Sequence, residues 1–203
     1  MSLPNILTLS RIPMMFVIVG LLYCQWLGAA SLAFWLFIFS ALTDYFDGLV
    51  ARRRGIVSHF GIFMDALTDK IFVLGLFIGL NDRKLILPES AFIPLVLLLI
   101  ILTREFLITG MRLVAATRGV VVSAEKAGKQ KTASQLISIG IFLAVPMFEQ
   151  DLYRFIHLDL TQFIEWLRHI GFWLLLFATF LTLRSAVMYF VKYKQLIFDE
   201  EIK

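Results

Sequence analysis

The chain has 203 residues, of which 60% are hydrophobic and 17% are charged, and it carries a formal net charge of +4. A mean hydropathy of +0.85 is far from that of soluble domains, so the composition excludes a soluble globular protein and predicts an all-α integral membrane protein. The length suits a single membrane domain over residues 1–203, the one cysteine excludes an internal disulfide, and no nucleic-acid partner is expected.

Six apolar stretches are long enough to be transmembrane helices, because a helix needs about 20 apolar residues to cross the hydrocarbon core. The segment before the first of them, residues 1–11, carries several polar side chains and is expected to form a short amphipathic helix at the membrane surface. We therefore expect a polytopic bundle of six transmembrane helices. In chain order these are 12–27, 32–50, 60–80, 92–116, 133–148 and 170–191.

The distribution of Lys and Arg predicts the orientation of this bundle, because basic residues are enriched in loops on the cytoplasmic side. The turn at 52–54, the segment 112–131 and the C-terminal tail are basic. The loops on the opposite side are uncharged, balanced or acidic, as in 149–165. Both termini are therefore expected on the cytoplasmic side of the inner membrane.

Four aspartates lie at the predicted cytoplasmic ends of the second and third helices. Asp44 and Asp47 are about 60° apart around their helix, and Asp65 and Asp69 are separated by about one turn of theirs. The short turn between the two helices predicts antiparallel neighbours whose aspartates face each other. A carboxylate at the centre of a membrane helix costs roughly 2.5 to 3.5 kcal/mol. No cationic side chain is expected beside Asp65 or Asp69, so a bound cation should compensate them.

The four carboxylates predict a metal site. Asp44 taken alone could equally be a helix cap, but the set of oxygen ligands without His or Cys favours a hard cation, Mg²⁺ or Mn²⁺. Gly48, Ala51 and Gly61 leave space beside the carboxylates, and Arg52 follows directly. This arrangement suits a phosphate bridged between a metal and a guanidinium group.

The aspartate pattern resembles the signature of the CDP-alcohol phosphotransferase family at every fixed position. It reads Asp44-x2-Asp47-Gly48-x2-Ala51-Arg52-x8-Gly61-x3-Asp65-x3-Asp69. Residues 4–11 are similar to the family's amino-terminal NxxTxxR element. Three further elements resemble the phosphatidylglycerophosphate synthases within that family. They are residues 103–106 (TREF), Gly110-x-Arg112 and residues 128–132 (GKQKT).

This resemblance implies an enzyme that transfers the phosphatidyl group of CDP-diacylglycerol to sn-glycerol 3-phosphate in a lipid membrane and releases CMP. It implies a homodimer with its active site on the cytoplasmic side, two divalent ions held by the four aspartates, and Asp69 as the general base. It also implies a binding site for the CDP-lipid. The residues expected there are Asn5, Thr8, Arg11, Thr43, Gly48, Ala51, Arg52 and Gly61.

A second basic cluster is expected to bind the acceptor. Arg104 and Arg112 are about 80° apart on the fourth helix. Arg104 lies inside the membrane and needs an anionic partner, either Glu105 or an aspartate for a structural pair, or the substrate. The resemblance favours a binding role for Lys129 and Lys131, so that two Arg and two Lys would surround a phosphate.

Several alternatives stay open at this stage. Inositol phosphate satisfies the same charge argument as glycerol phosphate, and serine or phosphatidylglycerol could serve as acceptor in the same chemistry. A protein of another class, a divalent-cation transporter, would use the aspartates as an ion site near the bilayer midplane. Gly75 and Gly79 on the third helix could serve helix packing or a dimer contact.

Overall fold

The computed structural model describes residues 3–54, 59–117, 126–153 and 160–198. Within these ranges, the side chains at 3–8, 44–54, 59–63, 65–66, 113, 116–117, 126–129 and 192–198 are outside the description. The described residues are almost entirely helical and contain no strand. The elements are α1 (Leu3–Tyr23), α2 (Ala29–Arg54), α3 (His59–Asp82), α4 (Phe92–Thr117), α5 (Lys126–Pro146), the π-helix η1 (Met147–Leu152) and α7 (Thr161–Phe198).

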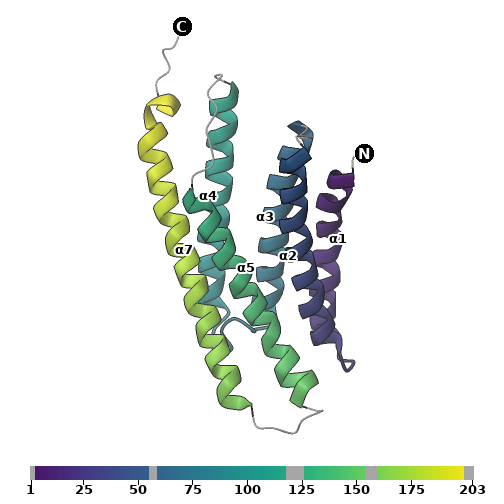
Figure 1. The fold of residues 1–203 in the computed structure, drawn as a ribbon. Coiled ribbons are helices and arrows are strands. Elements are labelled where there is room, and N and C mark those ends of the chain that lie inside the picture. The colour runs from purple at the N-terminus through teal and green to yellow at the C-terminus, as the bar shows by residue number, and fades with distance from the viewer. Residues whose placement is uncertain (1–2, 55–58, 118–125, 154–159, 199–203) are drawn as a thin grey trace.

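The helices form one elongated bundle (Figure 1). Helix α1 packs against α2 and α3, α4 packs against α3 and α7, and α5 packs against α2, α3 and α7. Helices α1, α3 and α5 begin at the end of the bundle drawn at the top of Figure 1, and α2, α4 and α7 finish there. We call this the upper end, and the end that carries η1 the lower end.

Each of the six predicted spans overlaps a helix, and the largest differences in the boundaries are in α1, in α5, which begins seven residues earlier than predicted, and in α7. Residues 3–11 are the first turns of α1 and no separate helix, because the chain continues through Pro13 without a break. The packing of α1 along two neighbours compensates for the hydrogen bond that a proline removes. Helix α7 has 38 residues, about 57 Å at 1.5 Å per residue, and therefore extends beyond a core of about 30 Å.

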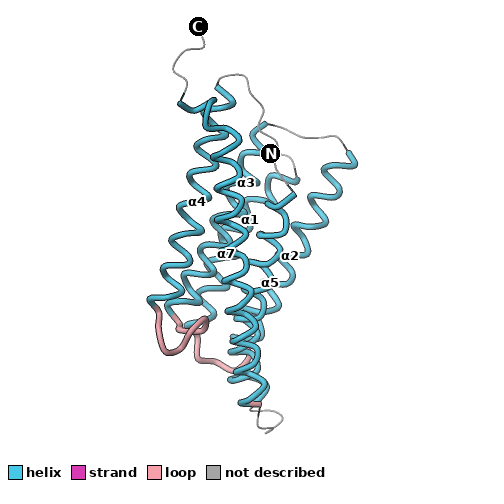
Figure 2. Tube along the Cα trace, turned by 90° about the vertical axis from the view of Figure 1, so that its left-hand side faces the viewer, coloured by secondary structure: helices cyan, strands magenta, loops and turns pink. Residues whose placement is uncertain are grey.

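Helices α2 and α3 are in contact as predicted, since the rings of Phe37 on α2 and Phe72 on α3 stack with their centroids 6.2 Å apart. Helix α1 packs closely against both helices, and Figure 2 shows α2 leaning away from the rest of the bundle towards the upper end. The close approach of α1 to α3 depends on two glycines, since a Cβ on Gly75 would collide with Met15 and one on Gly79 would meet Val19 at 3.0 Å. The GxxxG pair therefore serves helix packing within the chain.

Three helical stretches in the described part of the chain are long and apolar enough to cross a membrane: Phe92–Arg112, Gln130–Leu152 and Thr161–Val191. Two shorter apolar stretches, Leu9–Tyr23 and Ala29–Thr43, lie in α1 and α2. Large hydrophobic side chains such as Phe106 and Phe180 are exposed on the outside of the bundle. A surface of this kind is unfavourable in water and favourable in lipid, so the chain is a membrane protein.

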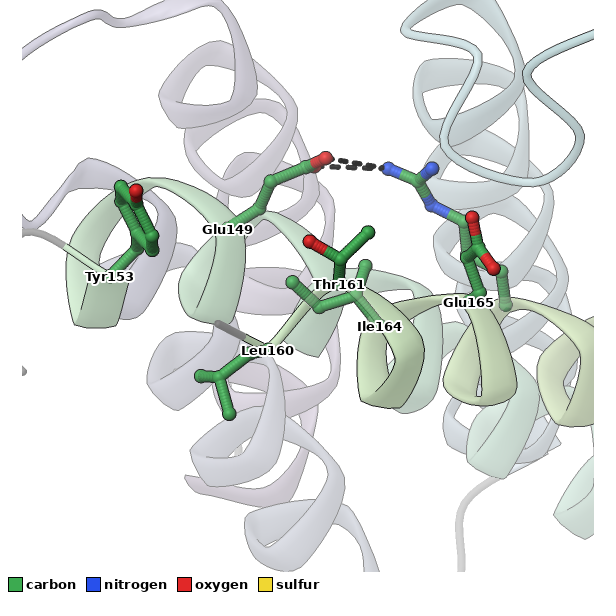
Figure 3. Close-up of a pocket in the computed structure, with 7 residues that line it drawn as sticks. Glu149, Tyr153, Leu160, Thr161, Ile164 and Glu165 are labelled. Carbon is green, nitrogen blue, oxygen red and sulfur yellow. Dashed lines mark hydrogen bonds and ion pairs between the residues drawn. The ribbon is translucent and has the colours of Figure 1, made fainter. Parts of the chain in front are cut away.

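At the lower end, part of the predicted loop 149–169 is helical. Within η1, the buried Asp151 accepts hydrogen bonds from the backbone N–H groups of Gly28 and Ser31, both at 2.8 Å, and from the Ser31 hydroxyl at 2.6 Å. These N–H groups lie at the start of α2, where a helix has unsatisfied donors and a partial positive charge. Nearby, Glu149 accepts two hydrogen bonds from Arg168 Nη2 at 2.9 and 3.1 Å (Figure 3).

Candidate active site

Asp69 is the signature aspartate whose side chain the structure describes. It lies on α3 with 36% of its side chain exposed, and its Oδ1 is 3.8 Å from Nη1 of Arg11 on α1. The expectation that no cationic side chain accompanies Asp69 is therefore wrong, because tertiary packing supplies Arg11 and the next residue along the chain is Lys70. The contact joins the amino-terminal element to the aspartate motif.

The other signature residues are placed by their backbone alone. Asp44, Asp47, Gly48, Ala51 and Arg52 lie in the last three turns of α2, where that helix reaches the upper end.

On the neighbouring helices, Gly61 and Asp65 lie in the first two turns of α3, and Asn5 and Thr8 lie at the start of α1. The described residues contain no cluster of three potential metal ligands, and the side chains of Asp44, Asp47 and Asp65 fall outside that set. Asp69 fits a metal site because its partly exposed carboxylate oxygens can reach a ligand.

Thr43, which the sequence places near the CDP-lipid, donates within its own helix. Its hydroxyl lies 3.0 Å from the carbonyl oxygen of Phe39 and 2.9 Å from that of Ser40. The hydroxyl proton is therefore used inside α2, and a ligand could reach only the oxygen lone pairs.

The second basic cluster surrounds one buried carboxylate, Glu105 on α4. Lys131 on α5 donates a hydrogen bond to Glu105 Oε1, and Arg104 Nη1 lies 3.1 Å from the same oxygen. Lys70 Nζ, on α3, lies 3.9 Å from Oε2. The side chains of Arg104 and Lys131 are only 7% exposed, and that of Glu105 is 11% exposed. Three helices thus contribute cations to one carboxylate in the interior.

Helix α7 orients both arginines. Arg104 Nη2 donates to Ser185 Oγ at 2.6 Å, and Arg112 Nη2 donates to Tyr189 Oη at 2.7 Å. The Arg112 guanidinium carbon is also 5.3 Å from the centre of the Tyr189 ring, a cation–π distance. Each arginine is therefore held at one end of its guanidinium group by a hydroxyl of α7.

One donor of each arginine, the Nε N–H, has no acceptor among the described residues. The Nε atoms of Arg104 and Arg112 are both buried and lack a hydrogen-bond partner there. A buried donor without an acceptor costs about 1 to 3 kcal/mol. Both guanidinium groups lie on α4 and carry a positive charge. This arrangement suits an anion with several acceptor oxygens.

The structure joins Arg104 and Lys131, two of the four residues predicted to bind the acceptor phosphate, through Glu105, and Arg112 lies about two turns further along α4 against Tyr189. The side chain of the fourth, Lys129, falls outside the described residues, although its backbone lies in the first turn of α5. The sequence left a structural ion pair and the substrate open as partners of Arg104. In the structure Arg104 pairs with Glu105, and its Nε donor has no acceptor among the described residues and could bind a substrate.

Sequence reasoning missed four contributors to the cluster: Lys70, Thr109, Ser185 and Tyr189. Lys70 carried a signal, since it directly follows the last signature aspartate. Ser185 and Tyr189 are four residues apart and so share one face of α7. Nothing in the sequence connects that face to α4, because the contact arises from tertiary packing.

The surface hollow shown in Figure 3 lies at the lower end and is not part of this site. It has a volume of about 570 Å³ and is lined by Glu149, Tyr153, Leu160, Thr161, Ile164, Glu165 and Arg168. The predicted aspartates and basic residues lie between the middle of the bundle, where Arg104 is placed on α4, and the upper end.

Comparison with known proteins agrees with the motif at the upper end. The family model for CDP-alcohol phosphatidyltransferase matches residues 1–184. The chain is 36% identical over 154 residues to the CDP-diacylglycerol–glycerol-3-phosphate 3-phosphatidyltransferase of Bacillus subtilis, which covers 70% of this chain and 76% of that protein. It is 31% identical over 190 residues to the protein of the same name from Rickettsia typhi, covering 93% and 95%. A probable phosphatidylglycerophosphate synthase of Mycobacterium tuberculosis is 37% identical over 145 residues, covering 70% and 66%. The chain belongs to the CDP-alcohol phosphatidyltransferase family.

Proposed function

We propose that this protein transfers the phosphatidyl group of CDP-diacylglycerol to sn-glycerol 3-phosphate, giving phosphatidylglycerophosphate and CMP. The names of its relatives support this acceptor. The structural observation that carries the proposal is the pair of buried arginine Nε donors without a partner among the described residues. Arg104 lies in a cluster with two lysines and one carboxylate, and Arg112 lies on the same helix; these cations suit a phosphorylated acceptor better than a zwitterion such as serine.

The reaction joins an acceptor oxygen to phosphorus and releases CMP. The hydroxyl oxygen of glycerol phosphate attacks the β-phosphorus of the CDP-lipid, the bond from that phosphorus to the CMP oxygen breaks, and the hydroxyl proton passes to Asp69. Arg11 Nη1, 3.8 Å from Asp69 Oδ1, links the amino-terminal element to the proposed base. Arg104, Arg112, Lys129 and Lys131 hold the phosphate of the acceptor so that its hydroxyl points to the reacting phosphorus.

Asp44, Asp47, Asp65 and Asp69 would hold the divalent ions, two Mg²⁺ or Mn²⁺. When bound, these ions neutralise the charge of the pyrophosphate. Around them, Asn5, Thr8, Arg11, Thr43, Gly48, Ala51, Arg52 and Gly61 form the CDP-lipid site. Arg52 pairs with a phosphate of the donor, and the glycines leave space for the close approach of that group.

We also propose how the protein lies in the cell. Helices α1, α2, α3, α4, α5 and α7 cross the inner membrane, with the first turns of α1 at its surface. The upper end faces the cytoplasm, where glycerol phosphate and CMP are soluble, and two copies form a homodimer. The distribution of Lys and Arg supports this orientation.

The decisive experiment offers purified protein CDP-diacylglycerol with one acceptor at a time and measures CMP release. The expected order is glycerol phosphate first, with inositol phosphate, serine and phosphatidylglycerol far slower. Faster release with any of the other three would reassign the acceptor and leave the family chemistry intact.

A further inference from the structure

Lys70 is a cation of the site that neither the motif nor the proposed reaction uses. Its ammonium group donates to the Thr109 hydroxyl. That hydroxyl itself donates to the backbone oxygen of Glu105 at 2.7 Å, so its proton is used and its lone pairs are directed at Lys70. The position of the Lys70 ammonium group is therefore fixed by α4.

The surroundings argue against a purely structural role in neutralising Glu105. That carboxylate already receives hydrogen bonds from Lys131 and Arg104. The distance of 3.9 Å from Lys70 Nζ to Glu105 Oε2 is too long for a hydrogen bond. Lys70 is therefore a third cation beside one carboxylate that two cations already satisfy.

The charge of this cluster favours an additional anion. Lys70, Arg104 and Lys131 bring three positive charges to the single negative charge of Glu105. Bringing three cations around one internal carboxylate costs Coulomb energy that a bound dianion would reverse. An ammonium group has three N–H donors, and Thr109 accepts from one of them.

Lys70 is also the most accessible of the three cations around Glu105. Its side chain is 27% exposed, compared with 7% for Arg104 and for Lys131. It directly follows Asp69 on α3, and its ammonium group reaches Thr109 and Glu105 on α4. We propose that Lys70 is a further binding residue for the acceptor phosphate, at the solvent-facing side of the cluster; the proposal rests on the proposed function.

Replacing Lys70 by Met tests this role, because methionine keeps most of the side-chain length and removes the charge. The KM for glycerol phosphate should rise about 10-fold or more, the factor expected for losing a hydrogen bond to a charged group. The KM for CDP-diacylglycerol should change less than twofold. Lys70→Arg should restore most of the acceptor affinity, and Thr109→Val, which releases the ammonium group, should raise the acceptor KM by a smaller factor. Lys84→Met, an exposed lysine at the lower end, is the matched control and should change neither KM.

A binding measurement separates this inference from the proposed function. Calorimetric titration of the detergent-solubilised protein with glycerol 3-phosphate should show weaker binding for Lys70→Met than for the unmodified protein. If that difference is found but no CMP is released with glycerol phosphate, the role of Lys70 stands and the proposed acceptor chemistry fails. If CMP is released and Lys70→Met keeps the acceptor KM and affinity of the unmodified protein, the role of Lys70 is overturned while the proposed function stands. Equal losses of donor and acceptor affinity in Lys70→Met would also overturn it, because they indicate general disruption.

Discussion

Lys131 on α5 donates a hydrogen bond to Glu105 on α4, and both side chains are almost entirely buried. The pair joins two helices that follow each other in the chain. It makes Glu105 the internal counter-ion of the proposed acceptor site. Glu105 lies at the centre of the site because Arg104 pairs with it as well.

Glu105→Gln should destabilise the protein, because it removes the charge that compensates two buried cations. Removing one partner of a buried ion pair costs about 3 to 5 kcal/mol. Thermal unfolding in detergent should show a clearly lower midpoint for this variant. The same substitution at Glu149, whose pair with Arg168 is partly exposed, should cost no more than about 1 kcal/mol. Equal midpoints for the two variants would contradict a central role for Glu105.

Turnover should depend on a divalent cation, since four neighbouring carboxylates and a pyrophosphate repel one another unless a cation lies between them. A chelator in excess should abolish CMP release, and added Mg²⁺ or Mn²⁺ should restore it. Calcium-saturated chelator is the control for unspecific effects of the reagent. Undiminished activity with metal-free chelator would rule out the proposed metal site.

Asp69→Asn should reduce turnover far more than it weakens donor binding, because the amide cannot accept the proton of the acceptor. General acid–base catalysis contributes typically about 10² to 10⁴-fold, and a loss of kcat in that range is expected. Binding of CDP-diacylglycerol, measured separately, shows how much of the loss comes from weaker metal affinity. Near-normal kcat in this variant would remove Asp69 as the base.

The sequence predicts where each helix lies along the chain better than it predicts which helices pack against each other. Apolar runs long enough to cross a membrane define a helix almost alone, and α4 begins at Phe92 as predicted. The packing of α1 against both α2 and α3 could not be predicted, because it depends on the fit of Met15 and Val19 onto two glycines of α3. Sequence spacing gives the face of a helix but not its partner.

The residues of the candidate site also fall into those that the sequence predicts and those that it does not. The sequence pointed to Arg104, Arg112 and Lys131 through charge and motif, and the structure joins Arg104 and Lys131 through Glu105. Ser185 and Tyr189 could not be predicted, because they are 81 and 77 residues away from the arginines that they orient. A hydroxyl on an apolar helix carries no sequence signal of its own.

Arg112→Ala and Lys131→Ala should each raise the KM for glycerol phosphate by a factor that corresponds to roughly 1.5 to 3 kcal/mol, the cost of a lost hydrogen bond to a charged group. The KM for CDP-diacylglycerol should change little. Tyr189→Phe keeps the ring beside Arg112 and removes only the acceptor oxygen, so a smaller rise is expected. Normal glycerol-phosphate kinetics in both alanine variants would show that the acceptor binds elsewhere.

The orientation of the bundle can be tested without any chemistry at the site. After Cys24 is replaced by Ser, single cysteines at positions 53, 130 and 150 can be labelled with a reagent that does not cross membranes. Gln130 begins the apolar stretch of α5 and Gln150 lies in η1, so they are at opposite ends of one continuous helical segment. If the upper end faces the cytoplasm, cysteines replacing Arg53 and Gln130 react only in inside-out vesicles, and a cysteine replacing Gln150 reacts only in intact cells.

Gln130 and Gln150 are both exposed at the protein surface, so a failure to react at either position reflects the membrane side and not burial. Labelling of position 130 in intact cells would reverse the proposed orientation, and it would place the acceptor site on the side of the membrane that lacks a supply of glycerol phosphate.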